Sequence, residues 1–123
     1  MSAAVEYDHA AEVHRIALST CEYLEAVEVY GEEEDGEVFE PLEVRVEGWR
    51  EPYRDTFHAN AVRLLMSYGG PNTWALIDGE GRLEVSCHWS EVRTVRGTAS
   101  DSLASWVLDM LLEADGSGSW GRA

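Results

Sequence analysis

Apolar positions follow two different periods in the first third of the chain, and each period predicts a different element. From Asp8 to Leu24 they recur every three or four residues, the spacing of one helical face, with Asp8 as a suitable N-cap. A period of two over residues 27–29, and again over residues 42–46, predicts two strands on either side of an acidic turn. We therefore expect a helix followed by an antiparallel strand pair.

The middle of the chain shows the most regular helical spacing. Phe57, Ala61, Leu64, Leu65 and Tyr68 lie at i, i+4, i+7, i+8 and i+11, and the run is followed by Gly69-Gly70-Pro71. This pattern predicts a second helix from Asp55 to Tyr68.

The last third of the chain alternates again and then returns to helical spacing. Residues 74–78 and 83–89 alternate on either side of Asp78-Gly79-Glu80-Gly81, which predicts a hairpin, and residues 92–96 fit a short edge strand. The apolar face of residues 103–114 predicts a third helix, with Thr98 and Asp101 at capping-box spacing.

The predicted order is α-β-β-α-β-β-(β)-α. Strands joined by short connections favour an α+β fold with an antiparallel sheet of four to five strands and three helices. A chain of 123 residues fits one domain, here residues 1–116, with 117–123 as a mobile tail. Cys21 and Cys87 are expected to be small apolar core residues rather than a disulfide.

Composition excludes several classes of protein. Hydrophobic residues make up 45% of the chain and occur in short periodic runs, whereas a membrane helix needs roughly 20 consecutive apolar residues. Residues 1–12 lack both a cationic start and an apolar stretch, so they do not resemble a signal peptide. We expect a cytoplasmic protein with no membrane partner.

Negative charge is the most unusual property of the sequence. The formal net charge is −15, and residues 1–47 hold 14 of the 24 acids with only two arginines. Residues 48–123 hold the other 10 acids and seven arginines. We expect the acidic stretch, with one nearby tryptophan, to bind a basic protein or nucleoprotein complex through Glu28, Glu32, Glu33, Glu34, Asp35, Glu37, Glu40, Glu43, Glu47 and Trp49.

Alternate strand residues are about 6.6–7 Å apart, close to the spacing of phosphates along a DNA strand, so a row of carboxylates can mimic DNA. A merely solvated charge run and a general adaptation to high salt are the alternatives. The second alternative would spread acids over the whole chain, so the asymmetry favours a partner. Direct nucleic-acid binding is not expected, because the chain repels a polyanion.

Candidate catalytic and metal-binding residues do not form a recognisable motif. His9 and His14 are five residues apart, about 140° from sharing a helical face, and His58 stands alone on the second predicted helix. Cys87 and His88 are adjacent in a predicted strand and so point to opposite faces. We expect no cofactor, no metal and no catalytic residue.

Tryptophan positions divide into two groups. Trp74, Trp89 and Trp106 are expected in the core, whereas Trp49 and Trp120 lie outside the predicted core positions.

One stretch of the sequence resembles a known family. Tyr68-Gly69-Gly70 after a predicted helix, Trp74, the turn at 78–81 and the Ser-rich start of an Ala/Leu helix at 100–112 are similar to the ArdB/KlcA antirestriction proteins. The resemblance covers roughly residues 57–112 and omits the acidic half. It implies a small acidic, non-enzymatic protein of a phage or plasmid that protects incoming DNA from host defence.

The sequence thus favours an anti-defence inhibitor, either antirestriction or anti-CRISPR, that binds a nucleic-acid site of a defence complex. An immunity protein that neutralises a basic nuclease toxin is one alternative, with Tyr30, Phe39 or Trp49 as an aromatic anchor. An enzyme of unknown type, using Cys87 or a carboxylate pair, is the other.

Overall fold

The computed structural model describes residues 9–30, 39–54 and 56–115. The element order is α1 (His9–Ala26), β1 (Glu43–Arg50), β2 (Phe57–Ser67), β3 (Asn72–Asp78), β4 (Arg82–Trp89), β5 (Glu91–Thr98) and α2 (Asp101–Ala114). The five strands form one antiparallel sheet in the order β1-β2-β3-β4-β5, so each strand pairs with its neighbour in sequence. The predicted α+β class and antiparallel sheet are confirmed, but the described residues contain two helices, not three.

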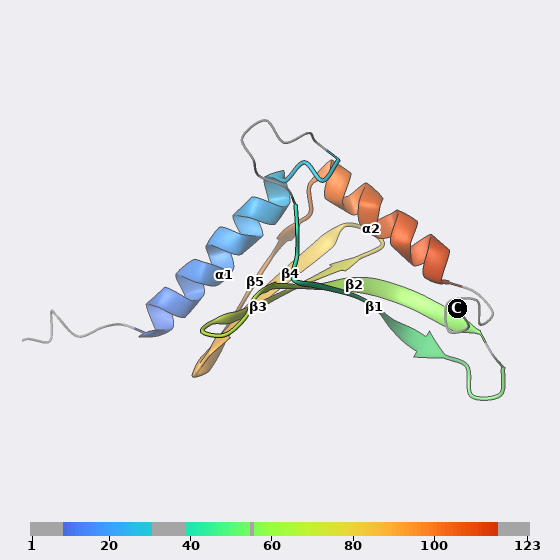
Figure 1. The fold of residues 1–123 in the computed structure, drawn as a ribbon, viewed down its shortest axis with the longest axis horizontal. Coiled ribbons are helices and arrows are strands. Elements are labelled where there is room, and N and C mark those ends of the chain that lie inside the picture. The colour runs from blue at the N-terminus through green and yellow to red at the C-terminus, as the bar shows by residue number, and fades with distance from the viewer. Residues whose placement is uncertain (1–8, 31–38, 55, 116–123) are drawn as a thin grey trace, which may run out of the picture.

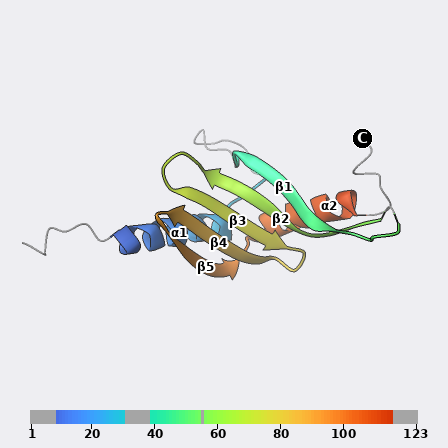
Figure 2. The same cartoon turned by 90° about the horizontal axis from the view of Figure 1, so that it is seen from below.

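Both helices lie on the same face of the sheet (Figure 1), with α1 over β4 and β5 and α2 mainly over β2 and β3. Figure 2 shows the sheet from its other side, with the strands in front of the helices. We call this side, which includes Arg63, Trp74, Glu84 and Ser86, the open face. No helix or strand of the described ranges covers it.

The core lies between the helices and the sheet. Each helix contributes one buried stripe at three- and four-residue steps, Val13, Ala17, Cys21 and Leu24 from α1 and Leu103, Val107, Leu111 and Ala114 from α2. They pack on the alternating inward residues of the strands, Val62, Leu64, Ala75, Ile77, Leu83, Val85 and Cys87. Burial of each Val or Leu contributes about 1.5–3 kcal/mol. The two helical faces were predicted correctly, and both cysteines are buried and free, as expected.

The predicted helix at 55–68 is wrong, because residues 57–67 form β2, the longest strand of the sheet. Its pairing has two irregularities, one beside Gly48 and one between Leu65 and Ser67, which leave Asn60 and Met66 without partners. An extra residue in a strand shifts the inward positions by one. Two such shifts turn a period of two into a spacing that resembles a helical face.

The predicted strand at 27–29 is also wrong, since residues 27–30 are a non-strand connection after α1. Side chains at the start of α2 form hydrogen bonds with the backbone of this connection. The hydroxyls of Ser100 and Ser102 donate to the Val27 carbonyl at 2.6 and 3.0 Å, and the Val29 amide donates to the Ser102 hydroxyl at 2.9 Å. The N-cap of α2 is Ser100, not Thr98, which is the last residue of β5.

The hairpin and edge-strand predictions are confirmed by β3, β4 and β5. In the turn between β3 and β4, one oxygen of Asp78 accepts hydrogen bonds from the amides of Glu80 and Arg82, and Gly81 has a φ of +82°. Burial alone would raise the pKa of Asp78, but the hydrogen bonds from Arg82 and Glu80 lower it. This turn fixes the register between β3 and β4.

Two of the three tryptophans predicted in the core lie elsewhere. Trp74 is on the open face, paired with Ser86, and Trp89 at the end of β4 is 37% exposed. Trp106 packs against the core and contacts the Phe39 ring edge-on. Trp49 is 51% exposed, as predicted, and Trp120 lies outside the described residues.

Candidate functional site

The predicted partner-binding residues fall in several places. Glu28 is exposed just after α1, and Glu40 is exposed ahead of β1. Glu43, Glu47 and Trp49 share one alternation of β1. The remaining predicted residues, Glu32, Glu33, Glu34, Asp35 and Glu37, lie outside the described residues, as does the proposed mobile tail at 117–123.

On β1 the carboxylates do not form an uninterrupted negative row. Arg45 lies between Glu43 and Glu47 and forms an ion pair with Glu43. Across the strand pair, Arg45 is directly opposite Arg63. Trp49 stacks on the His58 ring, with centroids 4.2 Å apart, and His58 contacts a Glu51 carboxylate oxygen at 3.1 Å. His58 therefore lies on a strand beside an aromatic ring, not alone on a helix.

Charge separates by layer in the folded chain. Helices α1 and α2 carry six carboxylates and one arginine, whereas the five strands carry five carboxylates and six arginines. The single helical arginine, Arg15, forms an ion pair with Glu12, and its hydrogen bond lowers the pKa of that carboxyl. The helical layer is thus the acidic side of the described molecule, and the sheet is close to neutral.

Three carboxylates lie around the place where the end of α1 approaches the start of α2, without converging closely enough to hold a metal ion. Glu25, Glu28 and Asp101 line an open hollow of about 510 Å³ there, which we call the helix junction. One oxygen of Glu25 accepts a hydrogen bond from the Thr98 amide at 3.3 Å. Of these three residues, sequence reasoning selected only Glu28. Asp101 was missed because more than 70 residues separate it from Glu28 along the chain and only the fold joins them, whereas Glu25, three residues before Glu28, was left out of the acidic stretch.

The open face is built from rows of side chains that run across the strands. One row is Arg45, Arg63, Leu76, Glu84 and Arg96, and the next is Glu43, Leu65, Trp74, Ser86 and Thr94. Glu84 pairs with Arg96 at 3.2 Å, and the hydroxyls of Ser86 and Thr94 are 3.0 Å apart. Charged, apolar and hydroxyl groups are therefore mixed on this face.

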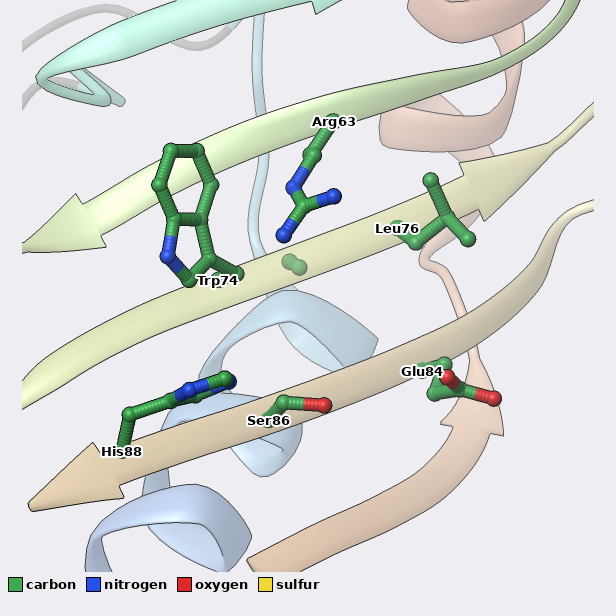
Figure 3. Close-up of a pocket in the computed structure, with 7 residues that line it drawn as sticks. Arg63, Trp74, Leu76, Glu84, Ser86 and His88 are labelled. Atoms are coloured by element: carbon green, nitrogen blue, oxygen red, sulfur yellow. The ribbon is translucent and has the colours of Figure 1, made fainter. Parts of the chain in front are cut away.

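A hollow of about 100 Å³ lies at the centre of the open face, between Arg63, Trp74, Leu76, Glu84, Ser86 and His88. In Figure 3 the Arg63 side chain reaches from β2 towards β3, with its guanidinium between Trp74 and Leu76. The guanidinium carbon is 4.5 Å from the centroid of the Trp74 ring, a cation–π distance. Glu84, Ser86 and His88 follow one another along β4 (Figure 3).

Neither candidate nucleophile, Cys21 or Cys87, is among the residues that line the two hollows. Cys87 is fully buried while the adjacent His88 is exposed on the other face, as the strand alternation predicted. Burial, and then the nearby charges of Glu25 and Glu22, raise the pKa of the Cys21 thiol. A raised pKa disfavours the thiolate that nucleophilic chemistry needs. Within residues 9–30, 39–54 and 56–115 no group of three or more potential metal ligands comes together.

None of the helices in the described ranges has the length and apolar character needed to span a bilayer. Comparison with protein-family models, with curated proteins and with solved structures finds no match for this chain. The resemblance to ArdB/KlcA proteins stays a prediction, and one of the features that carried it, a helix before Gly69-Gly70, is strand β2.

Proposed function

We propose that this chain is a non-enzymatic inhibitor that binds a positively charged nucleic-acid-binding site of a host defence complex, of the restriction or CRISPR kind. The observation that carries the proposal is the separation of charge between the two layers. Six carboxylates against one arginine on the helices, beside a nearly balanced sheet, make the helical layer the negative side of the part of the molecule that the structure describes. A one-sided field of this kind orients a protein towards a cationic partner before contact.

The helix junction is the part of this side that is best shaped for contact. Glu25 at the end of α1, Glu28 just after it and Asp101 at the start of α2 line one open hollow, so a cationic surface that enters it faces carboxylates from two chain segments. We expect guanidinium and ammonium groups that normally hold phosphates to bind here.

An immunity protein for a basic nuclease toxin is the second candidate, and exposed aromatic residues favour it. Tyr30 is 58% exposed and Trp49 is 51% exposed, so both are available as anchors, whereas Phe39 packs against Trp106. Aromatic anchors of this type often dominate the energy of tight protein interfaces. Rescue of cells that express a basic nuclease, without any effect on phage restriction, would favour this candidate.

The test is phage plating on hosts that carry either a type I restriction system or a CRISPR system, with and without the chain. We expect wild-type protein to raise plating at least about tenfold on one of these hosts. The variant Glu25→Gln/Glu28→Gln/Asp101→Asn should lose most of that effect, because the cationic partner loses its counter-charges.

A matched control removes three charges from the sheet side, Glu80→Gln/Glu84→Gln/Glu91→Gln. Each of these carboxylates is already paired with an arginine, so the control should keep its protective effect. No effect of wild-type protein on either host would contradict the proposed function, and equal loss in both triple variants would contradict the role of the helix junction. A gel shift with DNA at about physiological salt should show no binding by the protein alone.

A further inference from the structure

Arg63 is unusual among the arginines of this acidic protein. Arg15, Arg45, Arg54, Arg82, Arg93 and Arg96 each have a carboxylate partner. Arg63 is half-buried, and in the part of the chain that the structure describes it forms no ion pair; its recorded contact is with the face of Trp74. The guanidinium therefore keeps N–H groups that no described carboxylate pairs with, while its carbon lies over the indole ring.

The residues opposite Arg63 on the two neighbouring strands do not neutralise its charge. Arg45 is directly opposite on β1 and Leu76 directly opposite on β3. Like charges facing each other across a strand pair are destabilising, and an acid at position 45 would relieve this cost. The one acid in the hollow, Glu84, is paired with Arg96 on the far side. A bound anion would supply the charge that Arg63 lacks.

We propose that the hollow around Arg63 is a recognition site for a carboxylate carried by another polypeptide. The planar guanidinium matches a carboxylate with two parallel hydrogen bonds, and the cation–π contact with Trp74 holds the group in the hollow. The Ser86 hydroxyl and the exposed His88 imidazole lie on the same wall and add further donors. A doubly charged phosphate is disfavoured, because Glu84 also lines the hollow.

The volume of the hollow indicates whether its ligand is a free metabolite or a group that belongs to a larger polypeptide. Small-molecule sites usually enclose about 300–1,000 Å³, whereas this hollow has about 100 Å³. It can receive a carboxylate and a short stem while the rest of the ligand stays outside. Around it the open face presents Leu76 and Val92, which are 37% and 51% exposed and can contact the body that carries the carboxylate. The inference is independent of the proposed function, because the helix junction lies on the other layer of the molecule.

The experiment is an NMR titration of the full ¹⁵N-labelled chain, read at the Arg63 Nε–H and Trp74 indole N–H signals. The probes are N-acetylglycine for a C-terminal carboxylate and N-acetylglutamic acid α-amide for a side-chain carboxylate, at constant ionic strength. N-acetylglutamine amide is the neutral isostere, and inorganic phosphate tests the anion class. We expect saturable shifts with at least one carboxylate probe, which also identifies the source, and no saturation with the isostere.

The key variant is Arg63→Gln, with Arg45→Gln as the control that removes the same charge one strand away. Loss of a charge-assisted pair should weaken carboxylate binding about tenfold or more in Arg63→Gln, while Arg45→Gln should stay within about twofold, because its charge is already offset by Glu43. Arg63→Lys keeps the positive charge but loses the planar pair of N–H donors, so it should also weaken carboxylate binding. It replaces Arg63→Gln in the test if that variant does not fold. Equal response to the isostere, equal weakening by the two Gln variants, or tighter binding of phosphate would overturn the proposal.

Discussion

At Gly48 the backbone of β1 lies close against the neighbouring strand β2. A Cβ atom at this position would lie 2.2 Å from the carbonyl oxygen of His58 and 2.8 Å from the Phe57 ring. The pairing of β1 with β2 becomes irregular at the same point, between Glu47 and Gly48. Glycine therefore allows the two strands to stay together through the irregularity.

Replacing Gly48 with alanine should destabilise the fold by about 1–3 kcal/mol, because backbone atoms have to move to admit the methyl group. Gly70→Ala is the control, since nothing lies within 4 Å of its Cβ position, and it should change stability by less than about 0.5 kcal/mol. Urea unfolding of the two variants measures the difference. Equal midpoints would show that the strand pair can open at Gly48 without cost.

At the residue scale, sequence reasoning placed most buried side chains but misplaced Trp74. The alternation of residues 74–78 was correct, yet a large aromatic residue was assumed to face the core. The inward positions of β3 are instead Thr73, Ala75 and Ile77, whose side chains are all smaller than an indole and leave room for the helices. The partner of Trp74 is Arg63, eleven residues earlier, and no local pattern reports such a pair.

At the scale of elements, the strongest helical pattern of the sequence belongs to a strand. Periodicity is reliable only while a strand pairs without extra residues, and β2 contains two that interrupt its alternation. The helices and the β3–β4 hairpin were predictable because their patterns are regular and their turn residues are diagnostic. The helix junction was not predictable, because it joins chain segments brought together only by packing.

The start of α2 gives a test of how this helix is joined to the segment after α1. The Ser100 hydroxyl accepts from the Leu103 amide at 3.2 Å and donates to the Val27 carbonyl, so it both caps α2 and ties it to the segment after α1. Ser100→Ala should cost about 1–2 kcal/mol. Thr98→Ala, at the position that the sequence favoured as a cap, should cost less, since it removes only an exposed strand side chain. Thermal unfolding compares them, and a larger loss for Thr98→Ala would contradict the assignment of the cap.

At the scale of the whole molecule, the sequence predicted polarised charge but not its geometry. Counting along the chain placed most acids in the first 47 residues, whereas the described helices and strands share their acids almost equally, six and five, and differ in having one and six arginines. Asp109 and Glu113 on α2 come from the half of the chain that looked nearly balanced, and they contribute to the acidic side. Arginines spaced along the strands, by contrast, pair across or along the sheet and neutralise it.

This distribution predicts that salt stabilises the fold through the helical layer. Asp109 and Glu113 are four residues apart on α2, where like charges repel by about 0.2–0.5 kcal/mol per pair, and Glu22 is exposed on α1. Raising salt from about 0.01 to about 0.15 M shortens the screening length from about 30 to about 8 Å, so the melting temperature should rise by a few degrees.

The variant Glu22→Gln/Asp109→Asn/Glu113→Gln should melt higher than wild type at low salt and depend less on salt, because the repulsion has been removed. The control Glu80→Gln/Glu84→Gln/Glu91→Gln removes the same formal charge from carboxylates that are paired with arginines. It should gain little or lose stability, since each change also removes an attraction, and its salt dependence should stay near that of wild type. Identical melting curves for the two triple variants at both salt concentrations would show that only total charge matters, and that its division between helices and sheet has no effect on stability.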